Sequence, residues 1–194
     1  MVTNPFAHAS YLLRRKVFKL FGGSFHIYAP DGSLAFFSSQ KAFKLKEDIR
    51  IYSDETKSQE LLVITARRVI DLAATYDVFD SGSGTKIGAL RRKGLKSIVK
   101  DEWLFLNTSD REIGTIKEDH AALALLRRTA LSLVLPQTYH GTVGGRPACT
   151  FKRNFNPFVS KVQLDFSVDT AGALDRRLGI AAAIVLIAIE GKQN

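Results

Sequence analysis

The eleven uncharged residues from Gly179 to Ile189 constrain the fold of this chain more than any other segment. Their sequence, GIAAAIVLIAI, has no polar face at helical spacing. A helix that is apolar on every side has to be surrounded, either by lipid or by protein. At about 1.5 Å per residue it would span roughly 16 Å, about half of a ~30 Å hydrocarbon core. We therefore expect a helix buried inside the protein, because a longer span would take in the charged residues 175–177.

The chain before this helix has the alternating pattern of short strands. Phe43–Lys46 and Ile49–Tyr52 alternate apolar and polar residues, and Val162–Val168 does so without a break. Such alternation is typical of strands with one buried and one solvated face. Similar runs number about a dozen, at the spacing of an all-β sandwich or barrel.

A closed barrel around the terminal helix accounts for both patterns. Closure removes exposed strand edges, and the lumen gives an all-apolar helix its surroundings. We therefore predict a mainly β fold, an antiparallel barrel of about twelve strands enclosing a hydrophobic C-terminal helix. That helix is expected to begin near Ala173, with Asp169 or Thr170 as its N-cap. Its residues expected to be buried are Ile180, Ile184, Val185, Leu186, Ile187 and Ile189.

One unit, an apolar strand followed by a polar turn and a second strand, occurs three times. It occupies residues 27–34, 78–88 and 105–114, and Asp, Asn, Gly and Ser fill the turns. These residue types provide the backbone conformations that hairpins need. Gly88 and Gly114 lie just inside the returning strands, where glycine often marks a bulge or a close backbone approach.

The segment Asp119–Leu135 breaks the strand pattern. It begins with an N-cap candidate and is rich in Ala and Leu, which predicts one extra helix near 119–130. No linker or change of composition divides the 194 residues, so we expect a single domain over 1–194. The N-terminal residues lack the apolar run of a signal peptide, and the lone Cys149 is typical of a reducing compartment.

The formal charge of +9 predicts attraction to an anionic partner, either nucleic acid or a membrane surface. Arginine and lysine side chains bind phosphate oxygens, and each contributes about 1 kcal/mol near an anionic bilayer. The densest basic cluster is either an anion-binding surface or a solvated face, because neighbouring residues on a strand point to opposite sides. It consists of Arg91, Arg92, Lys93, Lys96 and Lys100.

Catalytic motifs are weak. Cys149 lies in an apparent strand, where a small buried residue is the ordinary case, and the four histidines are too scattered to predict a zinc site. Residues 81–88 lack P-loop spacing and a following helix, so they predict a hairpin turn. We expect no enzyme activity, and we assign no metal and no cofactor.

Residues 151–158, FKRNFNPF, have aromatic residues interleaved with basic ones, as in some single-stranded nucleic-acid binders. A strand end followed by a loop whose phenylalanines pack on the barrel is the favoured interpretation.

Several motifs resemble the LURP-one-related family, in an order that covers nearly the whole chain. They are Lys16–Phe25 with Tyr28 and Asp31-Gly32, Tyr76–Asp80, Ile87–Arg92, Asp101–Trp103, Ile113-Gly114 and the terminal apolar helix. That family is similar in fold to phospholipid scramblases and to the tubby C-terminal domain. The resemblance implies a twelve-stranded barrel wrapped around a hydrophobic C-terminal helix.

For function, the resemblance implies contact with phospholipids. Tubby-like domains bind phosphoinositide headgroups through basic side chains on the barrel exterior, and scramblases are associated with calcium-dependent lipid movement. Asp165, Asp169 and Asp175 lack the spacing and the closing Glu of an EF-hand, so no calcium site is expected.

We therefore expect a non-catalytic domain that binds anionic phospholipid or phosphoinositide headgroups through the 91–100 cluster. It would be cytoplasmic and peripheral at the inner face of the membrane. One alternative is a scramblase-like protein that moves phospholipids between leaflets by inserting residues 179–189. The other is a nucleic-acid-binding module, based on the charge and on residues 151–158.

Overall fold

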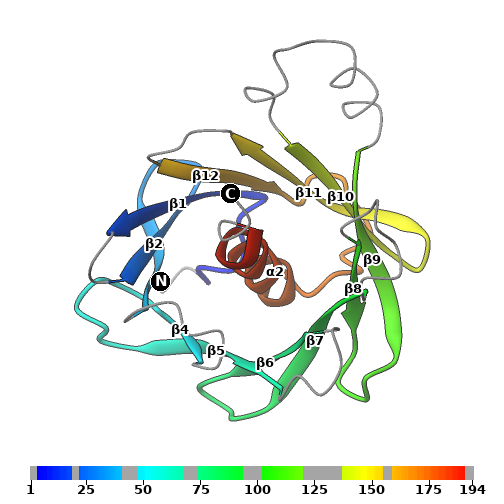
Figure 1. Cartoon of the computed structure of the whole chain (residues 1–194), viewed down its shortest axis with the longest axis horizontal. Coiled ribbons are helices and arrows are strands. Elements are labelled where there is room, and N and C mark those ends of the chain that lie inside the picture. The colour runs from blue at the N-terminus through cyan, green and yellow to red at the C-terminus, as the bar shows by residue number, and fades with distance from the viewer. Residues whose placement is uncertain are drawn as a thin grey trace.

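The computed structural model of the chain describes residues 4–18, 22–40, 48–67, 74–93, 102–119, 137–154 and 159–190. Twelve strands in these ranges form one closed antiparallel barrel, in which each strand pairs with its neighbours in sequence and β1 closes the barrel against β12 (Figure 1). The predicted mainly β barrel is confirmed. The strands are β1 (Ser10–Phe18), β2 (Gly22–Tyr28), β3 (Leu34–Gln40), β4 (Ile49–Tyr52), β5 (Glu60–Ala66), β6 (Thr75–Asp80), β7 (Lys86–Arg92), β8 (Glu102–Leu106), β9 (Glu112–Glu118), β10 (Gln137–Val143), β11 (Arg146–Asn154) and β12 (Val159–Asp165).

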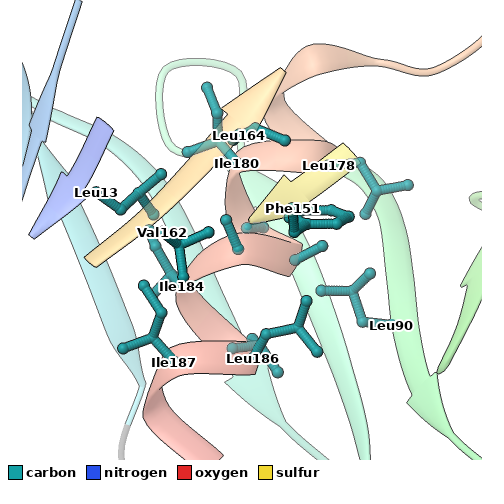
Figure 2. Packing of buried hydrophobic residues seen from close by; sticks show 14 of the residues in the cluster. Leu13, Leu90, Phe151, Val162, Leu164, Leu178, Ile180, Ile184, Leu186 and Ile187 are labelled. Atoms are coloured by element: carbon teal, nitrogen blue, oxygen red, sulfur yellow. The ribbon is translucent and has the colours of Figure 1, made fainter. Parts of the chain in front are cut away.

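The helix α2 (Arg176–Glu190) runs through the middle of the barrel. Its side chains from Leu178 to Ala188 are buried, apart from Gly179, which has none and whose backbone is buried as well. Figure 2 shows how they meet the inward-facing residues of the wall, such as Leu13 of β1, Leu90 of β7 and Phe151 of β11. The predicted burial of Ile180, Ile184, Val185, Leu186 and Ile187 is confirmed, whereas the side chain of Ile189 lies outside the described part.

The start of α2 differs from the sequence prediction, which placed it near Ala173. The helix begins at Arg176, because Asp175 acts as the N-cap and its carboxylate accepts a hydrogen bond from the Arg177 N–H at 2.9 Å. Asp169 caps the preceding turn instead, where its carboxylate accepts the N–H groups of Ala173 and Leu174. Those N–H groups are therefore satisfied without a helical turn.

The three predicted hairpins are confirmed and lie at the barrel end where α2 begins. Their turns share one device, an Asp or Asn side chain that accepts the backbone N–H of a serine two or three residues later: Asp31 to Ser33, Asp80 to Ser83 and Asn107 to Ser109.

Gly88 and Gly114 each stand opposite a register shift, as expected of bulges. A Cβ atom at Gly114 would collide with the backbone oxygen of Thr142, so this position requires glycine.

Two further expectations concern the helices. The extra helix predicted near 119–130 falls almost entirely outside the described residues, since only Asp119 is described there. Within the ranges given above, no helix combines the length and the apolar character needed to cross a membrane.

Candidate anion-binding surface

The predicted 91–100 cluster lies at the end of β7 and beyond it. Leu90 faces the core, so alternation places Arg92 on the same side and Arg91 on the outer face. Lys93 donates a hydrogen bond to Glu102 Oε1 at 2.9 Å, and this carboxylate neutralises the charge of Lys93. The described members therefore do not share one surface. Lys96 and Lys100 lie outside the described residues, so their role in headgroup binding stays a prediction.

A second group of cations, on the outer face of β5 to β7, is neutralised by carboxylates. Arg67 donates to both carboxylate oxygens of Asp77 and to Asp110, each at 2.6 Å. Lys86 reaches the same two carboxylates, at 2.9 Å to Asp77 and 2.6 Å to Asp110. Hydrogen bonds from Arg67 and Lys86 lower the pKa of Asp110 to about 2. We call Arg67, Asp77, Lys86 and Asp110 the paired wall.

The arginine pair at the start of α2, Arg176 and Arg177, anchors the helix to the barrel mouth. Arg177 donates to Asp80 of the β6–β7 hairpin at 2.8 Å and to its own N-cap, Asp175, at 2.6 Å. Arg176 donates to the backbone oxygen of His8 at 2.9 Å, and its guanidinium lies 4.9 Å from the centre of the Phe166 ring. Both arginines therefore serve the fold.

Arg15 lies inside the barrel at the opposite end of the helix, with only 4% of its surface exposed. Its Nη1 donates to the carbonyl of Ile187 at 3.0 Å, where a cation offsets the negative end of the helix dipole. Burial, together with the nearby charge of Arg153, lowers the pKa of Arg15 to about 10. This arginine also serves the fold.

A third group of cations lies on the outer face of β1, β12 and β11. Tyr11, Leu13 and Arg15 point into the barrel, so Arg14 points outward. Strand pairing sets Arg14 directly opposite Lys161, and the next row sets Gln163 opposite Lys152 of β11. Within the described part of the chain, none of these three cations makes an ion pair. We call Arg14, Lys152 and Lys161 the basic wall.

The carboxylates close to the basic wall are engaged elsewhere. Asp165, at the end of β12, accepts the Ser167 N–H at 2.7 Å, and Glu55 lies 2.8 Å from His26 Nε2. Like charges directly opposite each other on a sheet are destabilising, so the Arg14–Lys161 pairing costs stability.

The basic wall was missed by the sequence reasoning. Its members come from opposite ends of the chain, one on each of three strands, and no local cluster marks them. Alternation along a strand predicts that Arg14 and Arg15 point to opposite sides, but the sequence alone could not show which of them points outward or that Lys161 lies opposite it. The alignment of β1 with β12 is the signal that could have found the wall.

In the segment 151–158, whose aromatic and basic residues suggested a nucleic-acid binder, neighbouring side chains also point to opposite sides of the barrel wall. Phe151 is buried in the core, while Lys152 is exposed on the outer face, and Phe155 and Phe158 lie outside the described residues. Phe151 therefore cannot stack on a base without leaving the core.

The side chains considered for catalysis have structural partners. Cys149 is buried in β11, and burial raises the pKa of its thiol far above the ordinary value. The ring of His26 contacts the rings of Tyr28 and Phe37, and its Nε2 lies 2.8 Å from Glu55 Oε1. His140 Nε2 lies 3.5 Å from an Asp119 carboxylate oxygen.

Comparison with protein families matches residues 34–187 of the chain to the family described as LURP-one-related. No curated protein and no solved structure matches the chain. The matched range covers β3 to β12 and nearly all of α2.

Proposed function

The chain belongs to the LURP-one-related family, and on this premise we propose that it is a non-catalytic domain that binds anionic phospholipid headgroups at a membrane surface. The observation that carries the proposal is the basic wall. Three cations without carboxylate partners, among the described residues, lie on adjacent strands of one outer face. Cations on adjacent strands of one outer face can contact several phosphates of a membrane surface at the same time.

The expected strength of binding follows from the number of cations. Each Lys or Arg near an anionic leaflet contributes about 1 kcal/mol, so three would raise the affinity roughly 100-fold over a neutral wall. This strength suits a reversible, peripheral association. We propose that it takes place at the cytoplasmic face of a membrane, where anionic lipids are concentrated.

Co-sedimentation with vesicles tests the proposal. The wild type should bind phosphatidylserine and phosphoinositide vesicles at low salt and should not bind neutral vesicles. Binding should be lost at ~0.5 M salt, because the Debye screening length falls to roughly 4 Å there and surface charges no longer attract the anionic lipid at longer range. The variant Arg14→Glu/Lys152→Glu/Lys161→Glu should lose binding at low salt as well.

A matched control separates the wall from the overall charge. The variant Lys57→Glu/Arg111→Glu/Arg146→Glu has the same change in net charge, and its three residues are exposed and are not members of the wall: Lys57 and Arg111 lie in loops, and Arg146 is the first residue of β11, six residues before Lys152. It should keep most of the binding. Equal losses in the two variants would show that the basic wall is not the binding surface.

Binding measurements of the same kind also test the two alternative functions, membrane insertion and nucleic-acid binding. Binding to vesicles that survives high salt would favour insertion, although α2 is buried and would have to leave the barrel to enter a bilayer. No binding to any vesicle, with strongly salt-dependent binding to DNA or RNA, would favour a nucleic-acid-binding module.

A further inference from the structure

A groove of about 440 Å³ opens on the outer face of β1, β2 and β12, next to the basic wall. Arg14, Tyr28 and Gln163 line it from three strands, and Ser10 and the turn at Pro30 and Gly32 close its end. The strand register explains this arrangement. Leu12 stands opposite both Tyr28 and Gln163, and Arg14 is two residues farther along β1 on the same face.

The groove has a definite charge. Arg14 is half-buried there, and among the described residues that line it no carboxylate occurs. Its guanidinium carbon lies 5.9 Å from the centre of the Tyr28 ring, so the ring supports the arginine beside the groove. A guanidinium held in this way presents a planar set of donors, which matches the oxygens of a phosphate.

The other polar groups extend the same chemistry. The amide of Gln163 and the hydroxyl groups of Ser10 and Tyr28 can each donate a hydrogen bond to an oxygen-rich ligand. The Tyr28 ring offers an apolar surface of the size of a small alcohol or polyol. The groove therefore combines a phosphate-binding end with a surface for the alcohol part of an ester.

We propose that this groove binds one terminal phosphate monoester, with Arg14 as the phosphate ligand and Tyr28 against the alcohol portion. A monoester has three free oxygens and about two negative charges at neutral pH. It can enter a recess, whereas the phosphodiester of a simple phospholipid lies between two substituents. The inference rests on the proposed function, because the groove opens on the surface that would face the lipid.

Two variants of the groove give the test. Tyr28→Ala removes the ring without changing the charge, and Gln163→Glu places a carboxylate beside Arg14 in a side chain of nearly the same shape. Gln59→Glu is the matched control, since it adds the same charge at an exposed residue of the β4–β5 turn. Thermal melting of each variant checks that the barrel is folded.

The probes are vesicles of equal surface charge that contain either phosphatidylserine or a phosphatidylinositol monophosphate. The wild type should prefer the monophosphate vesicles by at least about tenfold. Tyr28→Ala should abolish this preference and leave phosphatidylserine binding unchanged. Gln163→Glu should abolish it as well, with a loss on phosphatidylserine of no more than about fivefold, the effect of one charge.

Free inositol 1-phosphate distinguishes the two sources of the ligand. If it competes with the monophosphate vesicles, the groove accepts soluble phosphate esters too; if it does not, the ligand is the lipid headgroup. Both results uphold the groove, provided that the two variants lose the preference.

The inference would be overturned if the wild type bound both kinds of vesicle equally, or if Tyr28→Ala kept the preference. In either case salt-sensitive binding through the basic wall would leave the proposed function standing. Absence of vesicle binding by the wild type would instead overturn the proposed function.

Discussion

The two opposite walls of the barrel carry cations in different states. On the paired wall, Arg67 and Lys86 share Asp77 and Asp110 in a closed network of ion pairs. On the basic wall, across α2 in Figure 1, Arg14 faces Lys161 with no carboxylate bound to either among the described residues. The density of basic residues along the sequence therefore does not tell which cations stay without carboxylate partners in the folded chain. The proposed function depends on those that do.

The difference has a structural origin in the turn that follows β8. Asp110 lies in that turn at a φ of 62°, and its carboxylate reaches Arg67 and Lys86 on the outer face. No described turn brings a carboxylate to Arg14, Lys152 or Lys161 in this way. One wall is thus organised for stability, and the other retains its charge at some cost to stability.

The largest effect is expected from breaking the interior that both walls share. Ala182 is 1% exposed in the middle of α2, and Ala182→Asp would place a charge there without a partner. That costs several kcal/mol against a total stability of ~5–15 kcal/mol, so the variant should be unfolded or melt far below the wild type. Circular dichroism melting measures this.

Val168→Asp is the control for that variant, because Val168 is 39% exposed and should tolerate the same substitution. If Ala182→Asp melted like the wild type, α2 would not be part of the core, and both walls would need another support.

The next effect comes from converting the paired wall into a second basic wall. Asp77→Asn with Asp110→Asn removes both carboxylates and leaves Arg67 and Lys86 unpaired. Loss of the network should lower the free energy of unfolding by about 1–2 kcal/mol, since partly exposed ion pairs contribute up to ~1 kcal/mol each. Affinity for anionic vesicles should rise by up to roughly 30-fold, because two cations become available and each contributes about 1 kcal/mol.

Chemical denaturation and vesicle co-sedimentation measure the two results. Asp31→Asn with Asp54→Asn makes the same change in net charge at turn aspartates that bind serine and threonine groups. An equal gain in vesicle affinity in this control would mean that total charge, and not the state of each wall, governs binding.

Much of the fold was predictable because it depends on local patterns. The apolar segment 179–189 had to be surrounded by lipid or by protein, and its short length favoured protein; the structure buries it as far as Ala188. The three turns with Asp or Asn predicted hairpins, and all three are found. The start of α2 was placed too early, because the carboxylate of Asp169 satisfies backbone N–H groups in a turn that resembles a helix start in sequence.

The candidate site was less predictable for a physical reason. Arg14 meets Lys161 only when β1 closes the barrel against β12, and one residue of slip would turn either side chain inward. Barrel closure brings together residues from the two ends of the chain. Sequence patterns read over a short stretch of residues cannot reveal such a pairing. The 91–100 cluster was conspicuous in sequence, yet Lys93, just after β7, is paired with Glu102 at the start of β8.

The pH dependence of stability should distinguish the paired wall as well. Burial raises the pKa of Asp77, but hydrogen bonds from Arg67 and Lys86 outweigh it and the net direction is downward; the pKa of Asp110 is about 2. Their unfolded values are near 3.9, so as the pH falls the unfolded chain takes up these protons first. This contribution is present above about pH 4 and is lost as the pH falls toward 2.

Urea unfolding over this pH range measures the loss. The slope of stability against pH should be shallower for Asp77→Asn/Asp110→Asn than for the wild type, since the variant has neither carboxylate to titrate. Identical slopes would mean that these carboxylates titrate alike in the folded and unfolded chain, and that the paired wall adds no electrostatic stability.

The smallest effects come from exchanging arginine for lysine, which keeps the charge and removes the planar donors. Arg67→Lys should lower the free energy of unfolding by less than about 1 kcal/mol, because Arg67 binds both oxygens of Asp77 and a lysine would keep a single contact. Arg14→Lys should leave stability unchanged, since no described carboxylate depends on it, and should change binding to phosphatidylserine vesicles by less than about twofold. If Arg14→Lys instead destabilised the barrel as much as Arg67→Lys, the contact of Arg14 with the Tyr28 ring would stabilise the fold as much as the ion pairs of Arg67 do, and the two walls would not differ in kind. The pair of substitutions therefore separates the geometry of an arginine from its charge, because two carboxylates hold the guanidinium of Arg67, whereas the proposed binding to phosphatidylserine depends chiefly on the charge of Arg14.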